Sequence, residues 1–249
     1  MRIEVIASVN EIKSEDVINK TAIVIDALRA STVIVTALDH GATSVTAADT
    51  MGSAIQHCHE GALLGGERYC RKITGFDLGN SPLEYGTDVV QGKHVILTTT
   101  NGTRCLQKAS KAATLLVGAF INGKACAQAA SQFKRDIVIV CAGTNQLFAW
   151  EDGLCAGYIT NELSTYYEDD SFMVNDLGLA MLSSFREEQH DIQGALMRAQ
   201  SGIRLCKIGF HEDVKYCAAL DRTQLVPIMQ DGLLVPLEAN PRSKSSAHS

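Results

Sequence analysis

Long hydrophobic runs are missing from the chain, although 46% of its 249 residues are hydrophobic. No stretch approaches the roughly 20 consecutive apolar residues that a membrane-spanning helix needs. The first residues, MRIEVIASV, alternate like an edge strand, carry Glu4 early and lack the long apolar core of a secretion signal. We therefore expect a cytoplasmic protein without a membrane partner.

Clustered basic residues are also missing. The 22 Lys and Arg residues are scattered and are outnumbered by 28 Asp and Glu, which gives a net charge of −6. Because nucleic-acid phosphates require a clustered basic face, the composition argues against nucleic acid as the main partner. A small basic pocket remains compatible with this composition.

The eight cysteines form no CxxC pair and have no histidines at zinc-finger spacing. None is followed at the sixth position by arginine, so the phosphate loop of the cysteine-dependent phosphatases is absent. Several, such as Cys141, follow or join apolar runs and are interpreted as buried, reduced thiols.

The segment AIVIDALRAST, residues 22–32, predicts a buried strand that ends at Asp26 and a helix that starts at the AST triplet. The helix N–H groups, the Ser31 and Thr32 hydroxyls and Arg29 could then converge on an anion, while Asp26 suits a hard cation. For this motif alone, the simpler interpretation is that Asp26 pairs with Arg29 and caps the helix.

The segment HVILTTTNGTRCL repeats this pattern, with a strand over 94–97 and a hydroxyl-rich turn leading into a helix. We expect a second anion-binding turn made by Thr99, Thr100, Asn101, Gly102 and Thr103. The alternative is a threonine-rich strand followed by an ordinary Asn-Gly turn, which leaves the helix start unexplained.

A third unit has a strand over 137–140, a turn over 141–145, and Glu151 with Asp152 at or near the next helix start. Two acids at a helix start commonly do no more than complement its dipole. If the three strands run parallel, however, Asp26, the threonine turn and these acids share one carboxyl edge. Oxygen ligands beside an anion site favour magnesium over zinc.

Residues 63–82, LLGGERYCRKITGFDLGNSP, are interpreted as a long functional loop that contributes Glu67, Arg68, Asn80 and Ser81. A glycine-rich connection with solvated charges is the alternative. Further along the chain, GAFINGKA, residues 118–125, nearly matches the phosphate-loop pattern GxxxxGK[ST], but Ala125 stands where the pattern requires a hydroxyl. We therefore expect a helix that starts at Gly123.

The remaining pattern predicts helices over 176–220 that cover the sheet and a hairpin at Asp231 and Gly232. Arg198, Ser201 and Arg204 could reach the pocket from these helices. We expect a three-layer α/β/α fold with a largely parallel or mixed sheet. One domain over 1–237, which could comprise two α/β subdomains, would be followed by a frayed tail over 238–249, and a homo-oligomer is compatible with the pattern.

Taken together, VIDALRAST, GGER, GFDLGNSP, TTTNGT, VCAGT and EDGLCAG resemble the 2-phosphosulfolactate phosphatase family, the magnesium-dependent phosphatases of coenzyme M biosynthesis. The resemblance runs from about Ile23 to about Gly232 and implies an α/β phosphatase that acts on a small 2-phospho acid. Two positions depart from the family pattern: Ser201 stands where a histidine is expected, and Trp150 where an aliphatic residue is more usual.

The resemblance and the motifs assign the following residues. Catalytic roles go to Asp26, Arg29 and Arg68, substrate binding to Ser31, Thr32, Asn80, Ser81, Thr99, Thr100, Asn101, Gly102 and Thr103, and Mg²⁺ binding to Asp26, Glu67, Glu151 and Asp152.

The expected mechanism places magnesium between the acids and a phosphoryl oxygen, with water as the nucleophile. Arg29 or Arg68 and the threonine turn would neutralise charge as the ester breaks. Asp26 could attack instead, but the DxDx[TV] pattern typical of that chemistry is absent. The alternative function is a non-catalytic protein that binds small phosphorylated acids.

Overall fold

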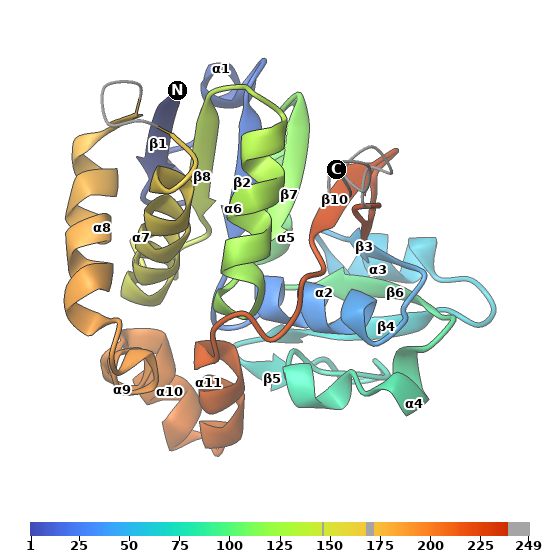
Figure 1. The fold of residues 1–249 in the computed structure, drawn as a ribbon. Coiled ribbons are helices and arrows are strands. Elements are labelled where there is room, and N and C mark those ends of the chain that lie inside the picture. The colour runs from blue at the N-terminus through green and yellow to red at the C-terminus, as the bar shows by residue number, and fades with distance from the viewer. Residues whose placement is uncertain (146, 168–171, 239–249) are drawn as a thin grey trace, which may run out of the picture.

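In the part of the chain that the structure describes, one sheet of eleven strands, flanked by helices, forms the framework (Figure 1). This computed structural model describes residues 1–145, 147–167 and 172–238. The strand order is β5-β4-β6-β3-β11-β10-β7-β2-β8-β1-β9. The predicted α/β class with a mixed, mostly parallel sheet is confirmed.

One end of the sheet is a parallel group. It consists of β1 (Arg2–Ile6), β2 (Thr21–Ile25), β7 (Thr114–Gly118), β8 (Ile137–Cys141) and the two-residue β9 (Met173–Val174). Every residue of β2, β7 and β8 is buried, as the apolar runs predict. The edge position expected for β1 is wrong by one strand, because β9 pairs outside it.

The other end holds β3 (Ser44–Ala47), β6 (His94–Thr98) and β4 (Leu63–Arg68) in parallel, with β5 (Arg71–Lys72) antiparallel to β4. The prediction of one long loop over 63–82 is therefore wrong in its first part. Gly65 and Gly66 obscure the strand in the sequence, yet both are needed for close packing. A Cβ at Gly65 would lie 2.2 Å from the Tyr85 hydroxyl, and one at Gly66 2.1 Å from the Thr98 carbonyl oxygen.

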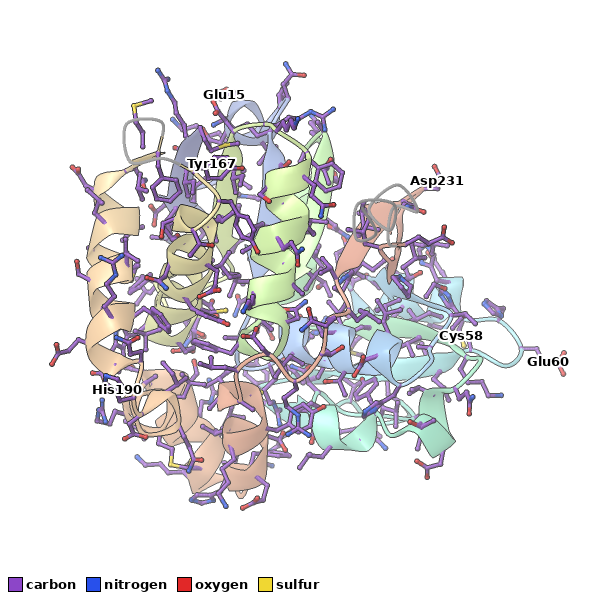
Figure 2. The ribbon with its side chains drawn as sticks, viewed as in Figure 1. Glu15, Cys58, Glu60, Tyr167, His190 and Asp231 are labelled. Atoms are coloured by element: carbon purple, nitrogen blue, oxygen red, sulfur yellow. The ribbon has the colours of Figure 1, made fainter. Side chains whose placement is uncertain are left out.

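The predicted hairpin, β10 (Pro227–Gln230) and β11 (Leu233–Pro236), joins the two groups. Asp231 and Gly232, with φ of 50° and 83°, form its turn, and Figure 2 shows Asp231 at the tip. β10 is antiparallel to β7, β11 to β10, and β3 to β11. Because β7 is parallel to β2 and β6 is parallel to β3, these three antiparallel pairings make β6 run opposite to β2 along the sheet. The parallel arrangement considered for the strands of the three strand-to-helix units is therefore wrong.

Two helices pack against strands of both groups and connect them. α2 (Ala30–Asp39) and α5 (Gly102–Ala109) share one apolar core with the inner faces of β2, β7 and β8 and with β3 and β6. On the outer face of the first group pack α6 (Gly123–Gln132), α7 (Trp150–Ser164) and α8 (Asp176–Glu188) (Figure 1). The carboxyl ends of β2 and β6 thus approach each other from two directions.

The remaining helices are short. They are α1 (Ser14–Val17), α3 (Met51–His57), α4 (Thr87–Val90), α9 (Ile192–Arg198), α10 (Gln200–Lys207), α11 (His211–Ala218), and the 3₁₀ turns η1 (Pro82–Glu84) and η2 (Phe120–Asn122). The helical prediction for 176–220 is confirmed, although α9 to α11 lie beyond the strand ends rather than over the sheet (Figure 1).

Gly123 starts α6, as expected for the near-miss phosphate loop. Within the described ranges, no helix is long and apolar enough to cross a membrane. The tail predicted over 238–249 falls, apart from Glu238, outside the described residues. The single domain over 1–237 stays a prediction.

Candidate active site

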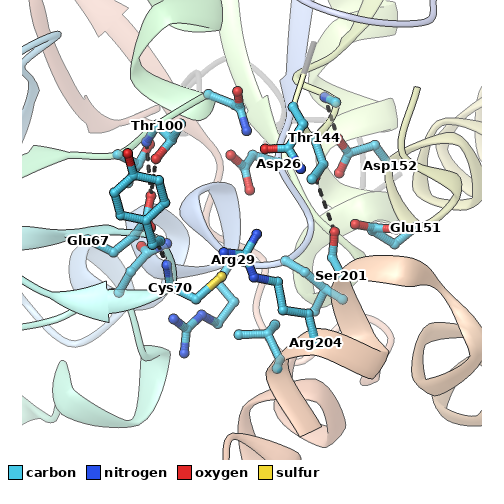
Figure 3. Close-up of a pocket in the computed structure, with 18 residues that line it drawn as sticks. Asp26, Arg29, Glu67, Cys70, Thr100, Thr144, Glu151, Asp152, Ser201 and Arg204 are labelled. Atoms are coloured by element: carbon cyan, nitrogen blue, oxygen red, sulfur yellow. Dashed lines mark hydrogen bonds between the residues drawn. The ribbon is translucent and has the colours of Figure 1, made fainter. Parts of the chain in front are cut away.

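A pocket lies where β2, β6 and β8 end, and α10 borders it with Ser201 and Arg204 (Figure 3). The predicted site residues that line it are Asp26, Arg29, Glu67, Asn80, Thr99, Thr100, Asn101, Glu151 and Asp152. Tertiary packing therefore brings acids and the threonine turn together from the three strand-to-helix units.

Asp26 follows the last residue of β2 and is held by the first turn of α2. The Ala30 N–H donates to Asp26 Oδ1 at 3.1 Å, and the Ser31 hydroxyl donates to the Asp26 carbonyl oxygen at 2.8 Å. Burial raises the pKa of Asp26 to about 7, against the lowering effect of the Ala30 N–H. The negative charges of Glu67 and Glu151 raise this pKa further.

Asp152, in the first turn of α7, ties two site loops together. Its Oδ1 accepts a hydrogen bond from the Ala27 N–H at 2.8 Å, and its Oδ2 accepts one from the Gly143 N–H at 2.9 Å. Burial, and then the charges of Asp26 and Glu151, hold its pKa well above the ordinary value. These two hydrogen bonds fix the loop after β2 against the loop after β8.

Glu151 is buried beside it, with 2% of its surface exposed. Burial raises the Glu151 pKa, and a hydrogen bond from the Ser201 side chain opposes that rise. Asp26, Glu151 and Asp152 thus form a buried acidic group whose members disfavour one another's ionisation.

Glu67, at the end of β4, shapes the threonine turn. Its Oε1 accepts hydrogen bonds from the Thr100 N–H and hydroxyl, both at 2.9 Å, and its Oε2 accepts one from the Cys70 N–H at 2.7 Å. The predicted metal ligand therefore already accepts three hydrogen bonds, and the two from Thr100 connect β4 to the turn after β6.

Arg29 pairs with an acid that the sequence did not indicate. Its guanidinium forms an ion pair with Asp213 of α11, and the two side chains are only 2% and 4% exposed. The Phe210 ring centroid lies 4.3 Å from Arg29 Cζ, and the Ser81 hydroxyl donates to Asp213 Oδ1 at 2.8 Å. The pairing of Arg29 with Asp26, considered as the simpler alternative, is wrong.

Six predicted residues do not line the pocket: Ser31, Thr32, Arg68, Ser81, Gly102 and Thr103. Hydroxyls at a helix start have carbonyl oxygens within reach, so Thr32 donates to Ala27 O at 3.0 Å and Thr103 to Thr99 O at 3.1 Å. Arg68 donates instead to Glu67 O at 2.7 Å and to the Thr98 hydroxyl at 3.1 Å. The side chains of Thr32, Thr103 and Arg68 are therefore engaged by neighbouring protein groups outside the pocket lining.

Gly102 lies at the start of α5, where a side chain would collide with Asp26. A Cβ at this position would lie 2.7 Å from both Asp26 Oδ2 and Ala30 Cβ. The missing side chain therefore lets the start of α5 approach Asp26.

Several lining residues were missed or only weakly indicated by the sequence. Tyr69 and Cys70 lie in the segment interpreted as a functional loop and Thr144 in the turn over 141–145, but none of the three was selected as a site residue. Arg204 was only one of several cations on helical faces. Asn80, which was expected, has a buried Oδ1 for which the described residues provide no hydrogen-bond partner. A buried acceptor of this kind in a pocket wall indicates that water or a ligand satisfies it.

The acids could hold a metal ion only if water or substrate supplied further ligands. Among the described residues, no group of three or more His, Cys, Asp and Glu side chains is placed to hold a metal ion alone. Magnesium often takes one or two protein carboxylates and completes its shell with water and substrate phosphate. Asp26 and Glu151 fit that requirement, because a cation would relieve the cost of ionising two buried acids.

The fold and the pocket together are those of an α/β enzyme for a phosphorylated substrate, with acids, helix starts and two arginines at one cavity. The family model described as 2-phosphosulpholactate phosphatase matches residues 6–232. The chain belongs to this family and is a phosphoric monoester hydrolase.

Similar proteins carry the same name. A "Probable 2-phosphosulfolactate phosphatase" of Clostridium acetobutylicum is 40% identical over 93% of this chain and 99% of its own length. Proteins so named in Clostridium tetani and Clostridium perfringens are 35% and 38% identical, over 94% and 98% of this chain and 100% of their own lengths. The resemblance found in the sequence motifs is confirmed.

Proposed function

We propose that the protein hydrolyses 2-phosphosulfolactate, or a small 2-phospho acid closely similar to it, to the 2-hydroxy acid and phosphate with Mg²⁺ as cofactor. Relatives at 35–40% identity are named for this substrate. The observation that carries the proposal is the position of Asp26 against the first turns of both α2 and α5. A carboxylate, a helix N-terminus and a threonine turn thereby face one cavity.

The phosphoryl group would bind at the start of α5. This N-terminus offers the positive end of the helix dipole, and Thr99, Thr100 and Asn101 line the adjoining wall. Arg29, fixed by Asp213, supplies a cation that needs no reorganisation as negative charge develops on the phosphoryl oxygens.

Asp26 and Glu151 would hold the magnesium ion, and Asp152 would add negative charge from behind them. When bound, the ion would neutralise phosphoryl charge and lower the pKa of a water molecule. Water oxygen bonds to phosphorus, the bond from phosphorus to the ester oxygen breaks, and a proton from water ends on that oxygen. Asp26 acts in its ionised form, and an acid-quenched aspartyl phosphate on Asp26 would contradict the role of water as nucleophile.

The test measures phosphate release from synthetic 2-phosphosulfolactate. Chelation should abolish turnover and added magnesium should restore it, because uncompensated carboxylates repel the phosphate. Asp26→Asn should lower turnover by about 100-fold or more, whereas Asp88→Asn, at an exposed position of α4 outside the pocket, should leave it unchanged.

Full turnover in excess chelator would contradict the metal assignment. Absence of phosphate release in the presence of magnesium would contradict the proposed substrate.

A further inference from the structure

Arg204 brings a second cation to the pocket. Of the described residues that line the pocket, only Arg29 and Arg204 are basic, against four acids. Arg29 is engaged by Asp213, but no ion pair or hydrogen bond found in the described parts of the chain engages the Arg204 guanidinium. An arginine that borders an acidic cavity without a protein partner is available for an anionic ligand.

The helix that carries Arg204 is fixed to the site by Ser201. The two residues are three positions apart on α10 and share one helix face. The Ser201 hydroxyl lies 3.1 Å from the Thr144 hydroxyl, and Figure 3 shows Ser201 beside Glu151. The Ser201 side chain opposes the rise in the Glu151 pKa that burial causes. Leu205, which is 2% exposed, anchors the next position. The side chain of Arg204 is exposed, whereas the helix that carries it is held against the loop after β8.

We propose that Arg204 binds one of the two acid groups, the carboxylate or the sulfonate, that hydrolysis leaves on the product, and so selects phosphate esters that carry an acid group besides the phosphate. This inference rests on the proposed function. 2-Phosphosulfolactate carries a carboxylate and a sulfonate besides its phosphate, and either would be repelled by Asp26 and Glu151. The arginine fork matches the paired oxygens of both groups and offsets this repulsion.

The test compares four phosphate esters with the wild-type enzyme and its variants. They are 2-phosphosulfolactate, 2-phospholactate with the carboxylate only, 2-phosphooxyethanesulfonate with the sulfonate only, and isopropyl phosphate with neither. Arg204→Ala should raise KM for 2-phosphosulfolactate by about tenfold or more, with a smaller change in kcat, as expected for loss of a charge-assisted contact. Arg204→Lys should give an intermediate KM, because it keeps the charge and loses the fork.

Lys207→Ala is the matched control, since it removes one positive charge from an exposed position of the same helix that does not line the pocket. The kinetic constants for isopropyl phosphate should change less than twofold in all variants. Of the two esters with one acid group, the one whose KM rises in Arg204→Ala identifies the bound group.

An equal loss on all four esters would overturn the proposal by assigning Arg204 to the phosphate, and unchanged constants would overturn it as well. Wild-type enzyme that releases phosphate from none of the esters would instead refute the proposed function. Melting temperatures of the variants separate misfolding from these outcomes.

Discussion

The ion pair between Arg29 and Asp213 connects the start of α2 to α11, and Asp213→Asn tests how much it contributes to stability. The two side chains are 2% and 4% exposed, so the substitution leaves a buried guanidinium without its counter-charge. Removing one partner of a buried pair typically costs about 3–5 kcal/mol. For a chain of this size a loss of about 3 kcal/mol lowers the melting temperature by about 6–12 °C.

Urea unfolding followed by circular dichroism measures the change in the free energy of unfolding. Glu212→Gln, in the exposed pair with Lys215 on the same helix, should change it by less than about 1 kcal/mol. The double variant Arg29→Met with Asp213→Leu removes both charges and should regain most of the lost stability. If Asp213→Asn costs no more than Glu212→Gln, the reasoning about the buried pair is refuted.

The remaining predictions concern Asp26 and Cys141. Because the pKa of Asp26 is about 7, against an ordinary value of 3.8, the folded metal-free protein keeps a proton that the unfolded chain releases. Its free energy of unfolding should therefore fall as pH rises from about 4 to 7, and Asp26→Asn should flatten this slope. Apparent magnesium affinity, measured by calorimetry, should weaken up to about tenfold per unit of pH below 7, and a pH-independent affinity would contradict the role of Asp26. Cys141 is fully buried, burial holds its pKa well above the ordinary value, and it does not line the pocket. Cys141→Ser should keep most of its turnover, and a trapped phosphocysteine in the wild type would contradict this.

Local sequence patterns were sufficient for the elements that begin and end at the site. The strands over 23–25, 94–97 and 137–140, with the helix starts that follow them, are specified by neighbouring residues: an apolar run, a polar turn and good helix formers. Asp26, Thr100 and Glu151 could be selected for that reason. The β4 strand escaped detection because the two glycines that its packing requires weaken the strand pattern.

Tertiary structure alone decided how these elements meet. The reversed direction of β6 arises because the β10–β11 hairpin pairs with β7 on one side and with β3 on the other. Both strands lie far from the hairpin in the sequence. Asp213 reaches Arg29 across 184 positions, and Arg204 reaches the pocket only because α10 docks against the loop after β8. The helical pattern of either segment carries no information about such partners, since burial beside one particular side chain is a property of the packed chain. The strand-to-helix units could therefore be predicted from the sequence. The pairing of Arg29 with Asp213 and the position of α10 beside the pocket were determined by the tertiary structure.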